Sequence, residues 1–330
     1  MRYKVKFDDH ETYFFKLFSS IEKRLRGSCQ KCMFPGCGGN AIGSHSQQDN
    51  GQLREIAEDQ HVIALRRGVC PAPRQSISSH DMGMRPKKIG IHKATVFKGF
   101  CNFHDTQLFL PIDTKPLVVD DIKQVYALHL RATSFELWSK RLVVGVLNTA
   151  LQESHRDLGI IREMARIHGK FFKADIRYLW TPLWTESPKD MLRWKWSVLD
   201  KNIGVSLTSC INPLDDISFP VYMESYYDRS CDEYTHSRPS FSLTILPVGD
   251  KTHVILCWNK TDEMTVRPWV ERMSSSKGVE KLLNECIFCK SEDFCLSPRL
   301  WDSLSDSDKK RIVDNLNQHC SDDVPNIIRL

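Results

Sequence analysis

Two short stretches decide the fold: CMFPGCGG at residues 32–39 and GFCNFHD at residues 99–105. The first holds Cys32 and Cys37, and the glycines after Cys37 permit the tight turn in which backbone amides face a thiolate. The second holds Cys101 and His104 at the expected start of a helix. Two such two-ligand pairs supply the four N and S ligands of a tetrahedral zinc site. We therefore predict a structural Zn²⁺ bound by Cys32, Cys37, Cys101 and His104 in a small ββα module.

Other residues in this span compete for the same role. Cys29 precedes Cys32 by three positions and forms a rival pair with it. The glycines after Cys37 favour Cys32, and Cys29 stays a substitute for it. His61, His80 and His92 are further replacement candidates, although a surface or core role is the better interpretation of any one of them.

Composition places the chain among globular proteins of roughly two domains. It has 330 residues, of which 41% are hydrophobic and 26% charged. It contains no run of about 18 apolar residues, which a membrane helix needs, and its N-terminus lacks the apolar core of a signal peptide. We therefore expect a cytoplasmic protein whose twelve cysteines are metal ligands or core residues, because the cytoplasm is reducing.

Charge is uneven along the chain. Residues 1–110 contain 17 Lys and Arg against 10 Asp and Glu, whereas the remainder contains 29 against 31. The basic excess thus coincides with the metal motif. A basic surface attracts phosphate backbones through counterion release, so nucleic acid is one expected partner. An ordinary solvated surface explains the same excess.

Periodicity predicts an α+β protein. In the first part it indicates a helix over 10–26, strands over 41–46, 61–65 and 94–97, a short helix over 51–58, an exposed loop over 68–90, and a helix from Asn102 to Pro111. Long packed helices follow over 117–177. Strands are then expected over 197–209, 220–223, 241–247 and 251–258, with a hairpin at Gly249-Asp250, and helices over 269–273, 279–286 and 305–316.

These elements suggest three parts. We expect a zinc-binding module over 1–115, a helical region over 116–178, and an α+β C-terminal domain with antiparallel strands over 179–330. In the last part Cys286, Cys289 and Cys295 are spaced like a second metal site, but their apolar neighbours favour buried core thiols. Four tryptophans lie between residues 180 and 196. One interpretation is that they stack on nucleic-acid bases. The favoured interpretation is that they fill the junction between two domains.

The metal motif resembles the HNH (His-Me finger) nucleases of treble-clef type, over roughly residues 27–112. The carriers of this resemblance are the Cys-x4-Cys pair, a histidine on a strand in Ser44-His45-Ser46, and a Cys-x2-His pair followed directly by Asp105. The resemblance implies that His45 is the general base and that Asp105 binds a catalytic Mg²⁺ or Mn²⁺. It implies a DNA endonuclease, of the kind found in bacterial anti-phage defence operons.

The chain also departs from the family's pattern at three points. Members of the family usually have a metal-binding side chain where this chain has Ser44, and the span from His45 to Cys101 is long. The asparagine that orients the base has two candidates, Asn50 and Asn102. A second hypothesis is therefore a zinc-stabilised nucleic-acid-binding module without catalysis. A third is an interaction subunit that docks a protein partner, with the C-terminal domain as a further partner surface.

Overall fold

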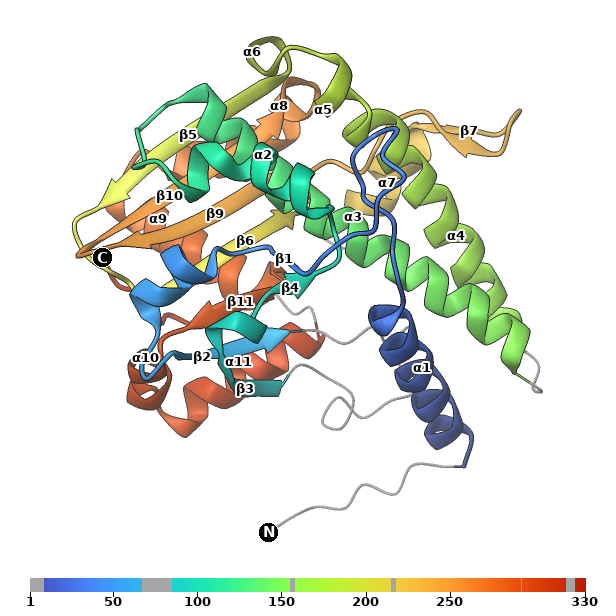
Figure 1. Ribbon diagram of the computed structural model, residues 1–330, viewed down its shortest axis with the longest axis horizontal. Helices are drawn as coiled ribbons and strands as arrows, with labels where there is room; N and C mark the ends of the chain where they lie inside the picture. Colours follow the sequence, from blue (N-terminus) through green and yellow to red (C-terminus); the bar gives the residue numbers. More distant parts are fainter. Residues whose placement is uncertain (1–8, 67–84, 155–157, 215–217, 292, 319–323) are drawn as a thin grey trace.

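A seven-stranded antiparallel sheet runs through the middle of the molecule (Figure 1). The computed structural model describes residues 9–66, 85–154, 158–214, 218–291, 293–318 and 324–330. From one edge to the other, the sheet comprises β3 (Arg85–Gly90), β2 (His61–Arg66), β11 (Asp293–Leu296), β6 (Val205–Ile211), β9 (Phe241–Val248), β10 (Lys251–Asn259) and β5 (Leu192–Leu199).

One face of the sheet packs against C-terminal helices and forms the largest apolar core. In β9, Phe241, Leu243 and Ile245 alternate toward this layer and are fully buried. Burying a side chain of this size stabilises the fold by about 1.5–3 kcal/mol. The covering elements are α8 (Glu263–Arg272), α9 (Ser276–Glu285), the π-helical turn η6 (Cys286–Lys290), α10 (Pro298–Ser303) and α11 (Asp306–Gln318).

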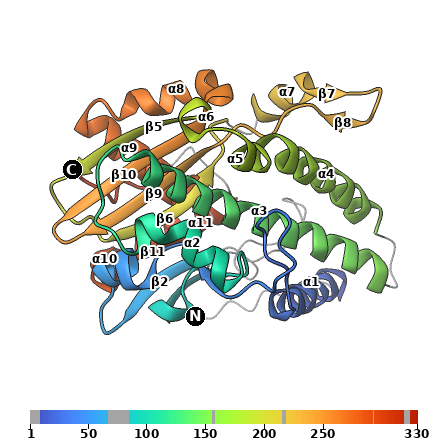
Figure 2. The ribbon, with the colours of Figure 1, turned by 45° about the horizontal axis from the view of Figure 1, so that its top comes forward.

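The opposite face of the sheet is covered by α3 (Ile122–Glu153), which crosses β6, β9 and β10 (Figure 2). The side chain of Asp121 accepts a hydrogen bond from the Lys123 backbone N–H at 2.7 Å and so caps the start of the helix. This layer is partly polar: His129 Nδ1 lies 2.8 Å from the Ser242 hydroxyl. Burial lowers the pKa of His129 to about 4, so its ring is neutral at pH 7.

Two long helices lie along α3. Phe18 and Ile21 of α1 (Asp9–Gly27) are buried against Val146 and Leu147 of α3. The helix α4 (Gly159–Asp175) packs against α3 as well. The chain then passes through η4 (Ile176–Trp180), α5 (Pro182–Thr185) and α6 (Pro188–Met191) into β5. None of the described helices is both long enough and apolar enough to cross a membrane.

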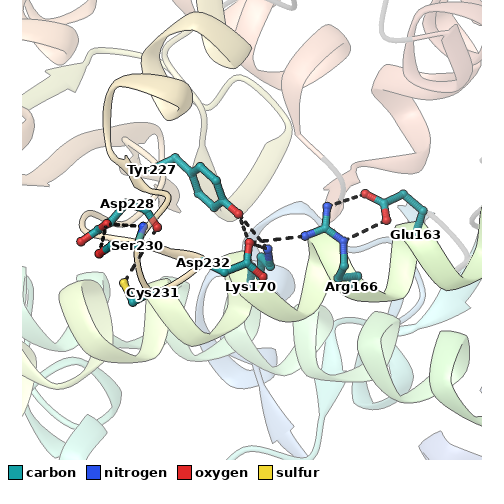
Figure 3. Close-up of polar contacts among 8 residues, drawn as sticks. All are labelled: Glu163, Arg166, Lys170, Tyr227, Asp228, Ser230, Cys231 and Asp232. Atoms are coloured by element: carbon teal, nitrogen blue, oxygen red, sulfur yellow. Dashed lines mark hydrogen bonds and ion pairs between the residues drawn. The ribbon is translucent and has the colours of Figure 1, made fainter.

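A small hairpin of β7 (Tyr227–Asp228) and β8 (Glu233–Tyr234) follows α7 (Ser218–Ser225) and is fastened to α4 by charge (Figure 3). Lys170 of α4 contacts both Asp232 and the Tyr227 hydroxyl. Arg166, one turn earlier, lies 3.9 Å from the Asp232 carboxylate and pairs with Glu163. These groups are mostly exposed, so they fix the position of the hairpin more than they stabilise the protein.

The α+β class with antiparallel strands is confirmed. Several local expectations need correction. Residues 220–223 belong to the helix α7. The expected strand over 197–209 is two strands, because Gly204 turns the chain with φ +68°. Residues 85–90 form the edge strand β3 instead of a loop, and the remainder of the expected loop, 68–84, lies outside the described residues.

The main sheet also crosses both expected domain boundaries. Arg66 pairs with Asp293, so β2 from the first part is hydrogen-bonded to β11 near the end of the chain. The three-part division stays a prediction, but its first and third parts share one sheet.

A buried ion pair ties α3, α4 and the segment after β8 together. The fully buried Asp175 carboxylate accepts from Lys140 Nζ at 2.9 Å and from Arg238 at 3.0 Å. Burial raises the pKa of Asp175, but the charges of Lys140 and Arg238 outweigh burial and lower it overall. The ionised form is therefore the one that stabilises the fold.

We expect Asp175→Asn to lower the free energy of unfolding by about 3–5 kcal/mol, because it removes the fully buried negative charge that pairs with the partly buried Lys140 and Arg238. Urea unfolding curves at pH 7 measure this. The folded pKa lies below the unfolded one, so the stabilisation is present above about pH 4 and disappears as the pH falls further. The difference in the free energy of unfolding between wild type and Asp175→Asn should therefore shrink below about pH 4. Glu224→Gln, in the exposed pair with Arg229, is the control, and an equal loss in both variants would contradict this role.

Candidate metal centre and the adjoining His45 site

Four ligand atoms from two distant segments converge on one point. One atom each of Cys32, Cys37, Cys101 and His104 lies within 4.8 Å of all the others. The Sγ atoms of Cys37 and Cys101 are 4.0 Å apart, and His104 Nδ1 lies 3.3 Å from Cys101 Sγ and 3.6 Å from Cys32 Sγ. Three thiols and one imidazole at this spacing can hold a tetrahedral metal ion. The predicted ligand set is thus brought together.

The first pair sits on a turn in which Gly36 takes the left-handed backbone conformation that glycine favours. The Cys32 N–H donates to the Gly39 carbonyl at 2.9 Å, and Gly36 has φ +76°. The Gly39 N–H points at Cys37 Sγ at 3.4 Å. A Cβ on Gly39 would lie 3.5 Å from Cys101 Cβ and 3.8 Å from its sulfur, inside the ligand cluster. These separations are ordinary van der Waals contacts, so the space around Gly39 does not by itself require a glycine.

Backbone bonds join the two segments independently of any ion. The Met33 N–H donates to the Gly99 carbonyl at 2.9 Å, and the Ile42 N–H donates to the Phe100 carbonyl at 2.7 Å. The second pair then opens α2 (Asn102–Asp113), whose first turn begins with the Asp105 N–H donating to the Cys101 carbonyl. The four ligands are held on two short, well-fixed stretches.

The thiols differ in their surroundings. Burial raises the pKa of Cys32 to about 11. The His104 backbone amide at the start of α2 lowers the pKa of Cys101. The ring of His104 is held in place by Phe34, which stacks on it with ring centroids 3.9 Å apart, and Trp184 meets Phe34 edge-on. The orientation of the imidazole is thus set by aromatic packing.

His45 lies on β1 (Ser44–His45), which pairs with β4 (Val96–Phe97). Its Nδ1 is 3.0 Å from the Ala94 carbonyl oxygen. A carbonyl can only accept, so Nδ1 carries the proton and Nε2 is the basic nitrogen of the neutral ring. The group that orients the His45 ring is therefore the backbone carbonyl of Ala94. Asn102 is exposed at the start of α2, and the Asn50 side chain lies outside the described part of the chain.

Asp105 lies on α2 directly after the metal ligand His104 and near the His45 strand. Burial raises its pKa, whereas the Ser44 hydroxyl and the charges of Arg131 and His45 lower it, and Asp113 raises it. The Oδ1 atom of Asp105 is buried without a hydrogen-bond partner. Ser44, His45 and Asp105 thus share one electrostatic neighbourhood beside the metal cluster.

The sequence did not predict the ion pair between Arg131 and Asp113, whose charges both act on Asp105. The Arg131 Nη2 donates to both carboxylate oxygens of Asp113 at 2.8 and 2.9 Å, and its guanidinium lies 4.2 Å from the centre of the Phe109 ring. Arg131 is only 5% exposed. A charged residue within the apolar run of an expected helix is the signal that would have found it.

The remaining candidates lie elsewhere. Cys29 is exposed and outside the cluster. His61 and His92 are outside it too, and His80 lies outside the described residues. Among the residues that the structure describes, the four-residue cluster is the only group of three or more potential ligands. Cys286, Cys289 and Cys295 are buried core thiols, as predicted.

No protein-family model, no curated protein and no solved structure matches this chain.

We expect purified protein to contain about one tightly bound metal ion per chain, measured by elemental analysis after exhaustive dialysis. Cys101→Ser removes a ligand at the centre of the cluster and should abolish stoichiometric binding. Cys29→Ser is the matched control, because Cys29 lies three residues from a ligand yet outside the cluster. Wild-type protein without metal, or equal loss in both variants, would contradict the site.

Proposed function

We propose that the chain is a zinc-stabilised, metal-dependent endonuclease that hydrolyses DNA phosphodiester bonds. The observation that carries the proposal is the placement of His45 and Asp105. His45 lies on a strand and Asp105 on a helix, Asp105 directly follows the candidate ligand His104, and the charge of His45 acts on the Asp105 carboxylate. The function rests on that arrangement together with the motif resemblance to HNH nucleases.

Zinc is the ion that suits the cluster best. Tetrahedral Zn²⁺ with bonds of about 2.3 Å to sulfur and 2.0–2.1 Å to nitrogen implies S···S separations of about 3.8 Å and S···N separations of about 3.5 Å. The observed 4.0 Å, 3.6 Å and 3.3 Å are close to these. With four protein ligands the ion has no open position, so its role is structural.

His45 is the residue proposed to act as the general base. The Ala94 carbonyl fixes the proton on Nδ1, which leaves Nε2 to take a proton from the attacking water. The short strand pair β1–β4 holds the ring in one orientation, since His45 lies opposite Val96 in register. Positioned bases of this kind contribute about 10²–10⁴-fold to a rate.

Asp105 is the residue proposed to bind the catalytic divalent ion. Its buried Oδ1 atom has no hydrogen-bond partner, and carboxylate oxygen is the ligand that Mg²⁺ and Mn²⁺ prefer. An ion there would offset the negative charge that develops on the scissile phosphate and the leaving oxygen. Asp113 is not available for the same role, because Arg131 occupies both of its oxygens.

Basic residues in the segment that leads into β4 favour a nucleic-acid substrate. Lys87 and Lys88 on β3 and Lys93 on the turn η3 (Ile91–Lys93) are exposed. They immediately precede β4 in the chain. Their charges would neutralise phosphates and make binding dependent on salt.

A binding module without catalysis is the second candidate. Ser44 is 2% exposed and supplies only a neutral hydroxyl where the HNH family usually has a metal ligand. Asp105 is then the one strong ligand for a second ion, and a single carboxylate binds Mg²⁺ weakly unless phosphate and water complete its shell. A role in anti-phage defence, for either candidate, rests on the motif resemblance alone.

We expect the protein to nick plasmid DNA with Mg²⁺ or Mn²⁺, and His45→Ala to lower the rate by about 10²–10⁴-fold. Asp105→Asn should lower it as well. His61→Ala is the control, since the described side-chain hydrogen bond of His61 runs from Nδ1 to the Asp59 carbonyl and involves no residue of the site. Metal content and melting temperature should match wild type in all three variants.

Tight gel-shift binding with no cleavage by wild-type protein would favour the binding module. Cleavage that survives in His45→Ala would remove this histidine from the chemistry.

A further inference from the structure

A stripe of basic side chains follows one side of α4 and of the turn η4. Residues 159–177 contain five Lys and Arg, at successive spacings of four, four, three and four residues. In a helix these spacings place side chains on one face. At about 1.5 Å per residue, the stripe is about 22 Å long. We call it the α4 basic stripe, and its members are Arg162, Arg166, Lys170, Lys173 and Arg177.

The acidic β7–β8 hairpin lies against the middle of this stripe (Figure 3). Its residues 227–234 include three acidic side chains and one basic one. The Asp232 carboxylate accepts from Lys170 and lies 3.9 Å from Arg166. The Glu233 carboxylate accepts from Arg177 at 3.2 Å. Two carboxylates of the hairpin thus act as counterions for three of the five cations.

The stripe keeps an excess of positive charge. Arg162 and Lys173 are exposed, and neither has an ion pair among the described residues. Inside the same stretch of chain, Glu163 pairs with Arg166, whereas Asp175 is buried and pairs with cations outside the stripe. Five cations face three paired carboxylates in all, so the excess is two. Such a surface attracts a polyanion.

The pairs between the hairpin and the stripe can be exchanged at the surface. The side chains of Arg166 and Arg177 are 49% and 63% exposed. Exposed ion pairs are weak and are screened by salt, and a guanidinium binds phosphate at least as well as carboxylate. The hairpin has a separate anchor, because Tyr234 stacks on Phe171 with ring centroids 4.7 Å apart. Exchange therefore needs only side-chain rotation.

We propose that the α4 basic stripe binds the phosphate backbone of DNA, and that Asp232 and Glu233 compete with the phosphates for its cations. The hairpin is then an autoinhibitory contact that lowers the affinity for DNA. The stripe would extend the nucleic-acid contacts beyond the basic residues of β3 and η3. The proposal rests on the proposed function for the identity of the polyanion.

Fluorescence anisotropy of a labelled DNA duplex, without added Mg²⁺ or Mn²⁺, measures binding by the full-length protein. The double variant Asp232→Asn/Glu233→Gln removes both competitors, and we expect it to bind about five- to tenfold more tightly than wild type at low salt. The matched control is Asp200→Asn/Glu224→Gln, which removes two exposed carboxylates that pair with cations outside the stripe. It should bind nearly as wild type does.

The salt dependence of binding counts the phosphate contacts. Each additional contact with duplex DNA steepens the slope of log K against log salt concentration by about 0.9. Asp232→Asn/Glu233→Gln releases at least two cations, so its slope should be steeper than that of wild type by about 1.8. The control variant should keep the wild-type slope.

A second variant tests the stripe without disturbing the hairpin. Arg162→Gln/Lys173→Gln removes two exposed cations that have no ion pair among the described residues. We expect it to weaken duplex binding about fivefold at low salt. Lys277→Gln/Lys281→Gln is its control, because these exposed lysines lie on α9, which covers the other face of the main sheet. Melting temperatures should match wild type in all four double variants.

The proposal is overturned if none of the proteins binds the duplex, or if Asp232→Asn/Glu233→Gln and Arg162→Gln/Lys173→Gln bind no differently from their controls. None of these measurements requires cleavage. Binding that responds to the stripe, in a protein that nicks no DNA, would keep the stripe and reject the nuclease. Nicking by a protein whose binding ignores the stripe would do the reverse.

Discussion

The convergence of three thiols and one imidazole is the constraint on which the N-terminal half depends. Cys32 and Cys37 meet Cys101 and His104 across more than sixty residues, and closing a loop of that length costs conformational entropy. Two backbone hydrogen bonds accompany the closure, and the stack of Phe34 on His104 extends it toward Trp184. The cluster therefore links a polar N-terminal loop to α2 and to the tryptophan core beneath it.

That link also places the side chains proposed for catalysis. The strand pair β1–β4 has only two residues in each strand, too few to be stable alone. It is held because Phe100, just before the second ligand pair, accepts from Ile42, just before the first strand. His45 and Asp105 thus owe their proximity to the same closure.

The sequence was most informative where chemistry or strong periodicity restricts the choice. The helix α1 and the hairpin at Gly249 could be predicted, because each depends on residues close together in the chain. The ligand set could be predicted because each of its two pairs is local and made of metal-binding residue types, although the pairs lie more than sixty residues apart. The edge strand β3 could not, since Pro86 and Lys87 oppose a strand everywhere except at a sheet edge. Residues 220–223 were misassigned because four apolar residues fit a strand and a helix equally well.

Long-range pairing was beyond the sequence altogether. Nothing in residues 61–66 identifies 293–296 as their neighbour, and yet Phe294 lies opposite Leu65 on one side and Leu207 on the other. The Arg131–Asp113 pair was missed for the same reason, because it joins two helices whose relative placement periodicity does not fix. The polar residues around Asp105 are brought together by tertiary contacts that the sequence does not reveal.

The position of β11 has a consequence for how this protein is made. It is the strand that joins β2 and β3 to the rest of the sheet, and it is synthesised about 200 residues after β3. At synthesis rates of about 5–20 residues per second, the β2–β3 hairpin waits on the order of ten seconds or more for its partner. During that interval its open edge is a template for mispairing, so chaperone protection matters most while translation is under way.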